Sequence, residues 1–312
     1  MTRLVISHYM PADHGTHVDF ILPWISRVQA VCPSLEFEVN CEGHPLGLLE
    51  NQFSQVSSGV VDIAHSPASL PPGRFPLTNL MNLPFLVEDS QQASDRLWKA
   101  HEIFLKGEFA PLHVLALHAD SGGVLHMRDT PVRSLDDLSG KRIRTPVGAI
   151  ADAMRATGAE PVHLLPPAIG QAARNGEIDG AIMAWDVLAY TGTQDIFRHH
   201  YEDVFYVSPL YLVMNPDSYA GLTSDERQAL DDCSGADLTP RFGAYWNTWS
   251  APGRALAQEE GHSLERLPLQ VMSGLRAAAT ESIRRHVNRS IEGGLVDASE
   301  VIDVFYGHNE RR

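Results

Sequence analysis

The chain has 312 residues, of which 44% are hydrophobic and 20% are charged, so it can bury a large core and is not a disordered protein. Its 24 basic and 39 acidic residues give a formal net charge of −15, which disfavours a nucleic-acid-binding surface and attachment to anionic lipid. No apolar stretch reaches the roughly 20 residues that span a bilayer. The N-terminus has the pattern of a strand rather than of a signal peptide, so we expect either a cytosolic protein or an exported one whose signal was removed.

The predicted elements alternate between short strands and helices. A strand opens the chain, a helix that Pro23 starts or kinks follows, and residues 35–40 alternate apolar with polar side chains as in a half-buried strand. Further strands are expected at residues 60–64, 112–117, 142–145, 160–164, 178–183 and 207–214. Helices are expected at residues 48–57, 90–107, 149–157, 168–175, 225–260 with a break near residue 234, 269–291 and 299–306. This alternation predicts an α/β fold with largely parallel sheets.

One short segment occurs twice. Residues 59–64 (GVVDIA) are similar to residues 176–181 (GEIDGA), and both follow a predicted helix. In each copy a helix ends at glycine and an aspartate leads into a buried strand. The repeated segment is consistent with two lobes of similar construction, each with a loop beyond a strand end. Open α/β sheets bind their ligands at such loops.

Motifs for nucleotide, hydrolase and metal chemistry are absent from the sequence. It contains no GxGxxG, no GxxxxGK[ST], no GxSxG and no HExxH motif. Histidines cluster only as His14 with His17 and as His199 with His200, and we interpret them as surface or capping residues. The three cysteines, at positions 32, 41 and 233, form no CxxC pair. We therefore expect neither a metal nor a cofactor.

A basic strand at residues 142–145 carries the clearest chemical signal. Arg142 and Arg144 face the same side of this strand, and Arg144 lies at its end, next to a helix that begins near Gly148. A guanidinium there can hold a carboxylate with two parallel hydrogen bonds, which an ammonium cannot do. The alternative is a surface arginine in a salt bridge.

Nearly the whole chain resembles the DctP-type substrate-binding proteins of TRAP (tripartite ATP-independent periplasmic) transporters. The most specific match is residues 131–144 (PVRSLDDLSGKRIR), followed at family spacing by residues 158–162 and 176–180. Supporting matches are residues 6–11 with His14, residues 59–64 and 83–86, Met214 with Asn215, and the run from residue 234 to 261. Their order and spacing together carry the resemblance.

The resemblance implies a two-lobed periplasmic-binding-protein-like fold (Venus flytrap) with a long helix spanning both lobes. We expect one lobe at residues 1–122 plus 208–250 and the other at 123–207 plus 251–312. A small organic acid binds between them, and the lobes close over it. The resemblance also implies a periplasmic monomer without catalysis that hands its ligand to the TRAP membrane permease subunits. Arg144 matches the carboxylate-binding arginine of the family.

Two departures from the family pattern bear on the ligand. Residues 182–184 read Ile-Met-Ala where many members have Glu-Asn-Pro, and Gly122-Gly123 stand where dicarboxylate types carry a basic residue. The two glycines open space, and Trp185 offers a stacking or apolar wall, although it can equally be a core tryptophan. We therefore expect a monocarboxylate with an apolar or aromatic body. The expected ligand contacts are Arg144, Trp185, His65, Ser66, His14, Phe85, Met183, Asp186 and Asn215.

Two other functions remain open at this point. The first is a cytosolic α/β enzyme that acts on a small carboxylate with His65 or His126 as a base. The second is a ligand-binding partner of a sensor, which would share the fold without the permease. A receptor binds its acid unchanged, with a stoichiometry of one and no turnover, and this separates it from the enzyme.

Overall fold

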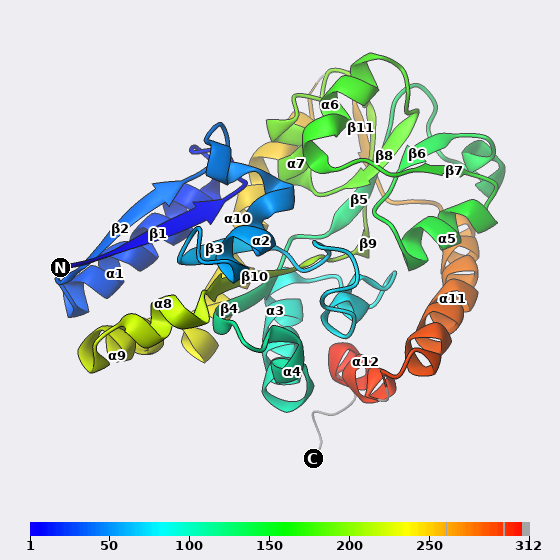
Figure 1. The fold of residues 1–312 in the computed structure, drawn as a ribbon. Helices are drawn as coiled ribbons and strands as arrows, with labels where there is room; N and C mark the ends of the chain where they lie inside the picture. The colour runs from blue at the N-terminus through cyan, green and yellow to red at the C-terminus, as the bar shows by residue number, and fades with distance from the viewer. Residues whose placement is uncertain (260, 296, 308–312) are drawn as a thin grey trace.

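The computed structural model describes residues 1–259, 261–295 and 297–307 and contains two β-sheets. The first sheet has the strand order β2-β1-β3-β10-β4, formed by β1 Thr2–His8, β2 Leu35–Asn40, β3 Ile63–Pro67, β4 His113–Ala119 and β10 Pro209–Met214. The second has the order β11-β9-β5-β8-β6-β7, formed by β5 Gly123–Met127, β6 Arg142–Arg144, β7 Glu160–Val162, β8 Gly180–Met183, β9 His199–Tyr206 and β11 Ser263–Glu265. Each sheet is the centre of one lobe (Figure 1).

Helices cover the sheets and confirm the predicted α/β fold. They are α1 Leu22–Val31, α2 Gln52–Ser57, α3 Ser90–Ala100, α4 Lys106–Phe109, α5 Ala149–Ala156, α6 Pro166–Arg174, α7 Trp185–Tyr190, α8 Pro216–Gly221, α9 Ser224–Asp232, α10 Thr239–Leu256, α11 Leu269–Glu292 and α12 Ala298–Tyr306. Buried apolar side chains form two clusters in contact with the first sheet and two with the second. Each sheet is therefore buried on both faces, as the layered α/β architecture requires.

The repeated segment of the sequence has the same structural role in both lobes. In the first lobe the Asp62 carboxylate accepts a hydrogen bond of 2.7 Å from the backbone N–H of Val5. In the second lobe the Asp179 carboxylate accepts one of 2.9 Å from the backbone N–H of Arg142. The preceding glycine, Gly59 or Gly176, has a positive φ, a conformation that other residues rarely adopt. Each aspartate thus ties the start of its own strand to the neighbouring parallel strand.

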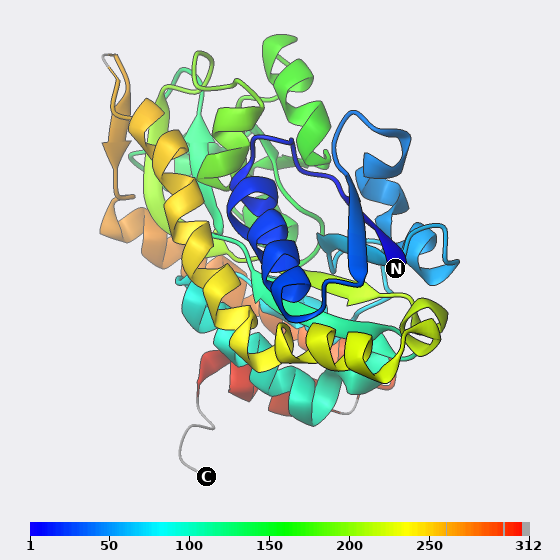
Figure 2. The ribbon, with the colours of Figure 1, turned by 90° about the vertical axis from the view of Figure 1, so that its left-hand side faces the viewer.

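Helix α10 contacts both lobes, as Figure 2 shows for the long yellow helix. Near its N-terminal end Gly243 lies against α3 of the first lobe, and near its C-terminal end Gly253 lies against the backbone of Trp185 at the start of α7. A Cβ atom at either glycine would overlap the facing helix. Ten residues of helix separate the two contacts, or about 15 Å along the axis. The long spanning helix expected from the family resemblance is therefore present.

The C-terminal helices run from the second lobe back to the first. Helix α11 packs against α5, and α12 packs against α3 and joins the apolar cluster of the first lobe. The lobe boundaries expected from the sequence stay a prediction, but this packing places α12 with the first lobe. Residues 308–312, at the end of the expected second segment, lie outside the described residues.

Candidate functional site

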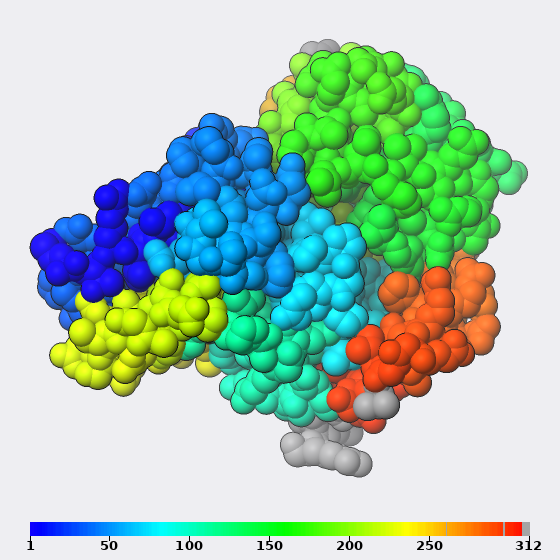
Figure 3. Space-filling model, viewed as in Figure 1, coloured from blue at the N-terminus to red at the C-terminus, as the bar shows by residue number. Residues whose placement is uncertain are grey.

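Strand directions bring the carboxyl ends of the parallel strands in both sheets to the segments that cross between the lobes. In the first sheet, β1 and β3 are parallel, and the end of β3 pairs with the start of β10. In the second sheet, β6 and β8 are parallel, and the end of β8 pairs with the start of β5. Residues 120–122 and 207–208 cross between these two edges. The molecular surface is hollowed where the blue and cyan first lobe meets the green second lobe (Figure 3), and ligands of α/β sheets bind at such edges.

Arg144, the last residue of β6, is buried at this edge with only 7% of its surface exposed. Its Nε donates to the carbonyl oxygen of Leu164 and one Nη to that of Ile182, both at 2.9 Å. Among residues 1–259, 261–295 and 297–307, no carboxylate forms an ion pair with it. Arg144 thus lies at the strand end, as the sequence predicts, and it is buried rather than in a surface salt bridge. A guanidinium held in place by backbone carbonyls and lacking an anion is suited to bind a carboxylate.

Tyr206, the last residue of β9, lies beside Arg144 and accepts a hydrogen bond from it. Because its oxygen accepts this bond, its own O–H remains free to donate to a ligand. Burial raises the pKa of Tyr206 to about 12, and the Arg144 charge acts in the opposite direction. Its ring also fills the space next to Gly123, where a Cβ atom would overlap it. Our expectation that Gly122 and Gly123 leave open space was wrong, because the Tyr206 ring occupies it at Gly123 and Val204 occupies it at Gly122.

Asp186 and His14 meet across the two lobes. His14 lies in the loop after β1 and Asp186 in the first turn of α7, and 3.4 Å separates His14 Nε2 from Asp186 Oδ2. The backbone N–H of Thr16 donates to His14 Nδ1 at 3.0 Å, so the neutral ring carries its hydrogen on Nε2, facing the carboxylate. Both side chains are at least nine-tenths buried. The structure therefore brings together two of the residues predicted for the site.

Tyrosines and a second aspartate surround this contact. Burial raises the pKa of the Tyr9 and Tyr190 phenols well above the usual value, and the nearby charge of Asp186 raises both further. Asp120 lies in the crossing segment, where its Oδ1 accepts hydrogen bonds from the backbone N–H groups of Gly122 (3.0 Å) and Ser208 (2.8 Å). Burial raises the pKa of Asp120 to about 7 although these amides lower it. Among the described residues, the side chains at the interlobe edge are thus aromatic and acidic, around the buried guanidinium of Arg144.

His65, near the middle of β3, ends a hydrogen-bond chain with a fixed direction. Trp246 Nε1 can only donate, so His118 accepts on Nδ1 at 2.8 Å and carries its hydrogen on Nε2. This hydrogen bonds His65 Nε2 at 2.9 Å, which leaves the hydrogen of His65 on Nδ1. Burial lowers the pKa of His65 and of His118 well below the usual value, so both rings are neutral. His65 Nδ1 is a buried donor with no partner among the described residues, and the ring stacks on Tyr9.

The other predicted contacts lie elsewhere. Trp185 packs edge-on to His126 in an apolar cluster of the second lobe, and Met183 belongs to the same cluster. Phe85 packs against Phe205 and lies under the guanidinium of Arg276. Trp185 thus has the environment of a core tryptophan, and the ligand contacts predicted for these three side chains stay predictions.

Asn215 and Ser66 are also separate from this group. Asn215 caps α8 through its Oδ1 and donates to the carbonyl oxygen of Val56. It follows the end of β10, which runs antiparallel to β3 and so ends at the opposite edge of the first sheet. Ser66 is buried beside the Tyr211 phenol, its direct partner across β3 and β10.

Four residues of the site were missed by sequence reasoning: Tyr9, Asp120, Tyr190 and Tyr206. Tyr9 directly follows the predicted first strand and Asp120 lies just beyond the predicted strand at residues 112–117, so a position at a strand end was the available signal for both. Tyr190 and Tyr206 end elements that showed no periodic pattern, α7 and β9, and no local signal identifies them.

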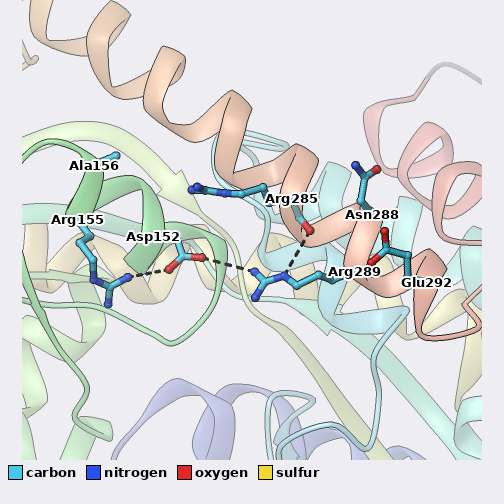
Figure 4. A pocket seen from close by; sticks show the side chains of 7 residues that line it. All are labelled: Asp152, Arg155, Ala156, Arg285, Asn288, Arg289 and Glu292. Carbon is cyan, nitrogen blue, oxygen red and sulfur yellow. Dashed lines mark hydrogen bonds and ion pairs between the residues drawn. The ribbon is translucent and has the colours of Figure 1, made fainter.

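A separate surface pocket of about 660 Å³ lies between α5 and α11 (Figure 4). Asp152 there pairs with Arg155 at 2.7 Å and with Arg289 at 3.6 Å. Within the described ranges, no group of three or more potential metal ligands occurs and no helix is long and apolar enough to cross a membrane. The acidic group of this pocket is thus paired with two arginines, whereas the buried Arg144 has no acidic partner among the described residues.

Comparisons with known proteins agree with the geometry. Among curated proteins, the outer membrane transporter protein TsaT of Comamonas testosteroni is 24% identical over 240 residues, which cover 75% of this chain and 70% of that protein. Among solved structures, the chain is similar to a TRAP solute-binding protein of a marine metagenome, specific for aromatic acid ligands (TM-score 0.92, 24% identity, 98% of both chains). It is also similar to one from Rhodoferax ferrireducens with copurified benzoate (TM-score 0.91, 24% identity, 98% and 97% covered). A third, from Bordetella bronchiseptica, contains bound mandelate (TM-score 0.88, 22% identity, 98% of both chains).

These similarities confirm the two-lobed fold expected from the sequence. The model of the family DctP, bacterial extracellular solute-binding protein, family 7, matches residues 37–252, which is more than half of the chain. The resemblance found in the sequence is thereby confirmed. The chain belongs to the DctP family of bacterial extracellular solute-binding proteins.

Proposed function

We propose that the protein binds a small organic acid between its lobes, a monocarboxylate with an apolar or aromatic body, and that Arg144 holds the carboxylate. The observation that carries this proposal is the burial of the Arg144 guanidinium without an acidic partner among the described residues. A desolvated cation is costly unless it is paired. A carboxylate bound there accepts hydrogen bonds from the Arg144 Nη atoms and from the free O–H of Tyr206.

Aromatic side chains near the acid favour a ligand with an apolar body. Tyr9 and Tyr190 lie near Asp186, and the His14 ring packs against Trp249, with 5.6 Å between the ring centroids. Such rings stack on flat or apolar groups. The named ligands of the similar structures, an aromatic acid, benzoate and mandelate, belong to this chemical class.

The same proposal covers transport. The protein acts in the periplasm as a monomeric receptor that delivers its ligand to TRAP membrane permease subunits. Neither histidine considered for catalysis is placed as a base. His65 carries its hydrogen on Nδ1, and His126 uses both nitrogens, on His200 Nδ1 at 2.8 Å and on the Met183 carbonyl oxygen at 3.2 Å. The site therefore favours binding without turnover.

Calorimetry with purified protein tests this function. We expect benzoate, mandelate or a related aromatic acid to bind with a stoichiometry of one and to be recovered unchanged by mass spectrometry. Binding of a C4-dicarboxylate alone would refute the monocarboxylate preference, and conversion of the acid to a product would favour the enzyme instead.

A further inference from the structure

The carboxylate of Asp186 is a buried group at the interlobe edge whose charge has the same sign as that of the proposed ligand. Its side chain is 5% exposed. Oδ2 lies 3.4 Å from His14 Nε2, while Oδ1 accepts no hydrogen bond from any described residue. Among those residues, the basic side chain next to it is the His14 ring, and no arginine or lysine forms an ion pair with it. A buried carboxylate oxygen without a donor is rare in folded proteins and points to a donor that arrives with a ligand.

Asp186 is close to the carboxylate-binding end of the site. The charges of Asp186 and Arg144 both act on the pKa of Tyr190. The charge of Asp186 also acts on the pKa of Tyr206, which is hydrogen-bonded to Arg144. The two charges come from different elements of the second lobe, Arg144 from the end of β6 and Asp186 from the start of α7. The site is thus bipolar, with a cation for the acid group and an anion within the reach of a small molecule.

We propose that Asp186 sets the chemical class of the ligand: Oδ1 accepts a hydrogen bond from a hydroxyl or amino group, and its charge excludes a second carboxylate. The inference rests on the proposed function, because it assumes that Arg144 binds the first carboxylate. The preferred ligand is then a monocarboxylic acid with a hydrogen-bond donor on its distal part. A hydrogen bond to a charged group contributes about 10- to 100-fold in affinity, and the low dielectric of the buried site strengthens the repulsion of a second anion.

Matched ligand series test the proposal on the wild-type protein. In the ring series benzoate is compared with 3- and 4-hydroxybenzoate and with isophthalate and terephthalate, which carry a carboxylate at the same positions. In the chain series butyrate is compared with 4-hydroxybutyrate and succinate. We expect at least one hydroxylated acid to bind about tenfold or more tightly than its unsubstituted parent, and its dicarboxylate counterpart to bind more weakly than that parent. Equal or tighter binding of the dicarboxylates overturns the proposal without the need for any variant.

Removal of the Asp186 charge then tests whether this carboxylate causes the ligand preference. Asp186→Asn keeps the shape of the side chain, and its amide can donate a hydrogen bond to a carboxylate. The affinity ratio of the hydroxylated acid to its parent should therefore fall below about threefold, and the affinity for the dicarboxylate should rise about tenfold. Asp195→Asn removes the same charge from an exposed position in the second lobe. It should leave the affinities of the hydroxylated acid and of the dicarboxylate, each relative to the parent acid, unchanged. Circular dichroism and urea unfolding check that both variants fold.

The outcomes separate this inference from the function on which it rests. If monocarboxylates bind and Asp186→Asn leaves both ratios at their wild-type values, Asp186 does not set the ligand class while the receptor function stands. If no member of either series binds, the proposed function fails and the role of Asp186 fails with it.

Discussion

Replacing Arg144 tests the centre of the proposed site, and the structure fixes the size of the expected effect. Arg144→Gln removes the buried cation but keeps a donor near the carbonyl oxygens of Leu164 and Ile182. Losing one side of a buried, hydrogen-bonded charge pair costs about 2–5 kcal/mol, which is roughly 30- to several-thousand-fold in affinity. The free energy of unfolding of the ligand-free protein should fall by much less, because the Arg144 guanidinium has no carboxylate partner among the described residues.

A thermal-shift assay converts these values into a measurement. Ligand at about 100 times its dissociation constant stabilises the wild type by about 2.7 kcal/mol; if the variant binds 100-fold more weakly, the same concentration gives about 0.4 kcal/mol. For a chain of 312 residues these correspond to shifts in Tm of about 4 °C and less than about 1 °C. Arg155→Gln, at a largely exposed arginine of the same lobe, should behave as the wild type. The reasoning is refuted if Arg144→Gln keeps the full shift.

One further variant tests the packing of α10 on the second lobe, and another tests the buried Asp120. Gly253→Ala places a Cβ atom into the carbonyl oxygen of Trp185 and should lower the free energy of unfolding by about 1–3 kcal/mol in urea titrations. Gly107→Ala meets nothing within 4 Å and should be neutral or slightly stabilising, so equal losses in both would contradict the packing argument. Burial holds the pKa of Asp120 at about 7, above the usual 3.8. Its protonation therefore contributes stability that is complete below pH 4 and is lost as the pH rises to about 7, at most about 4 kcal/mol. Asp120→Asn should gain stability relative to the wild type between about pH 5 and pH 8, and parallel pH profiles would count against this assignment.

Local sequence patterns were sufficient to predict the elements that end at a glycine or begin with a helix cap. Ser134 with Asp137 and Thr223 with Glu226 have the sequence spacing of a capping box, and both boxes form. The repeated aspartates have equivalent bonds in both lobes. Strands β5, β9 and β11 were missed because long-range pairing holds them. In β9 histidines and charged residues interrupt any alternation. Strand β3 was placed too early, because Val60 and Val61 precede the ladder that begins at Ile63.

The candidate site was predictable only where one strand end determines the position of a side chain. Arg142 and Arg144 share a face of β6, yet Arg142 pairs with Asp179 at the surface while Arg144 is buried. The periodicity could not distinguish these outcomes. Asn215 was selected because it follows a strand, but the direction of that strand relative to its neighbours is not encoded locally. Trp185 points into the core of its own lobe because α7, which was not predicted, begins at that residue.

The polar groups left unpaired at the interlobe edge explain why a ligand should favour the closed arrangement of the lobes. Arg144 belongs to the second sheet, whereas the unpartnered Nδ1–H of His65 belongs to the first. If the lobes separate, we expect water to reach both groups and to restore their hydrogen bonds without any ligand. In the arrangement seen here both groups are buried, so we expect a molecule that lies between the lobes to supply the missing partners. Its affinity for the closed state therefore exceeds that for the open state, and such a difference is what allows a ligand to shift the equilibrium.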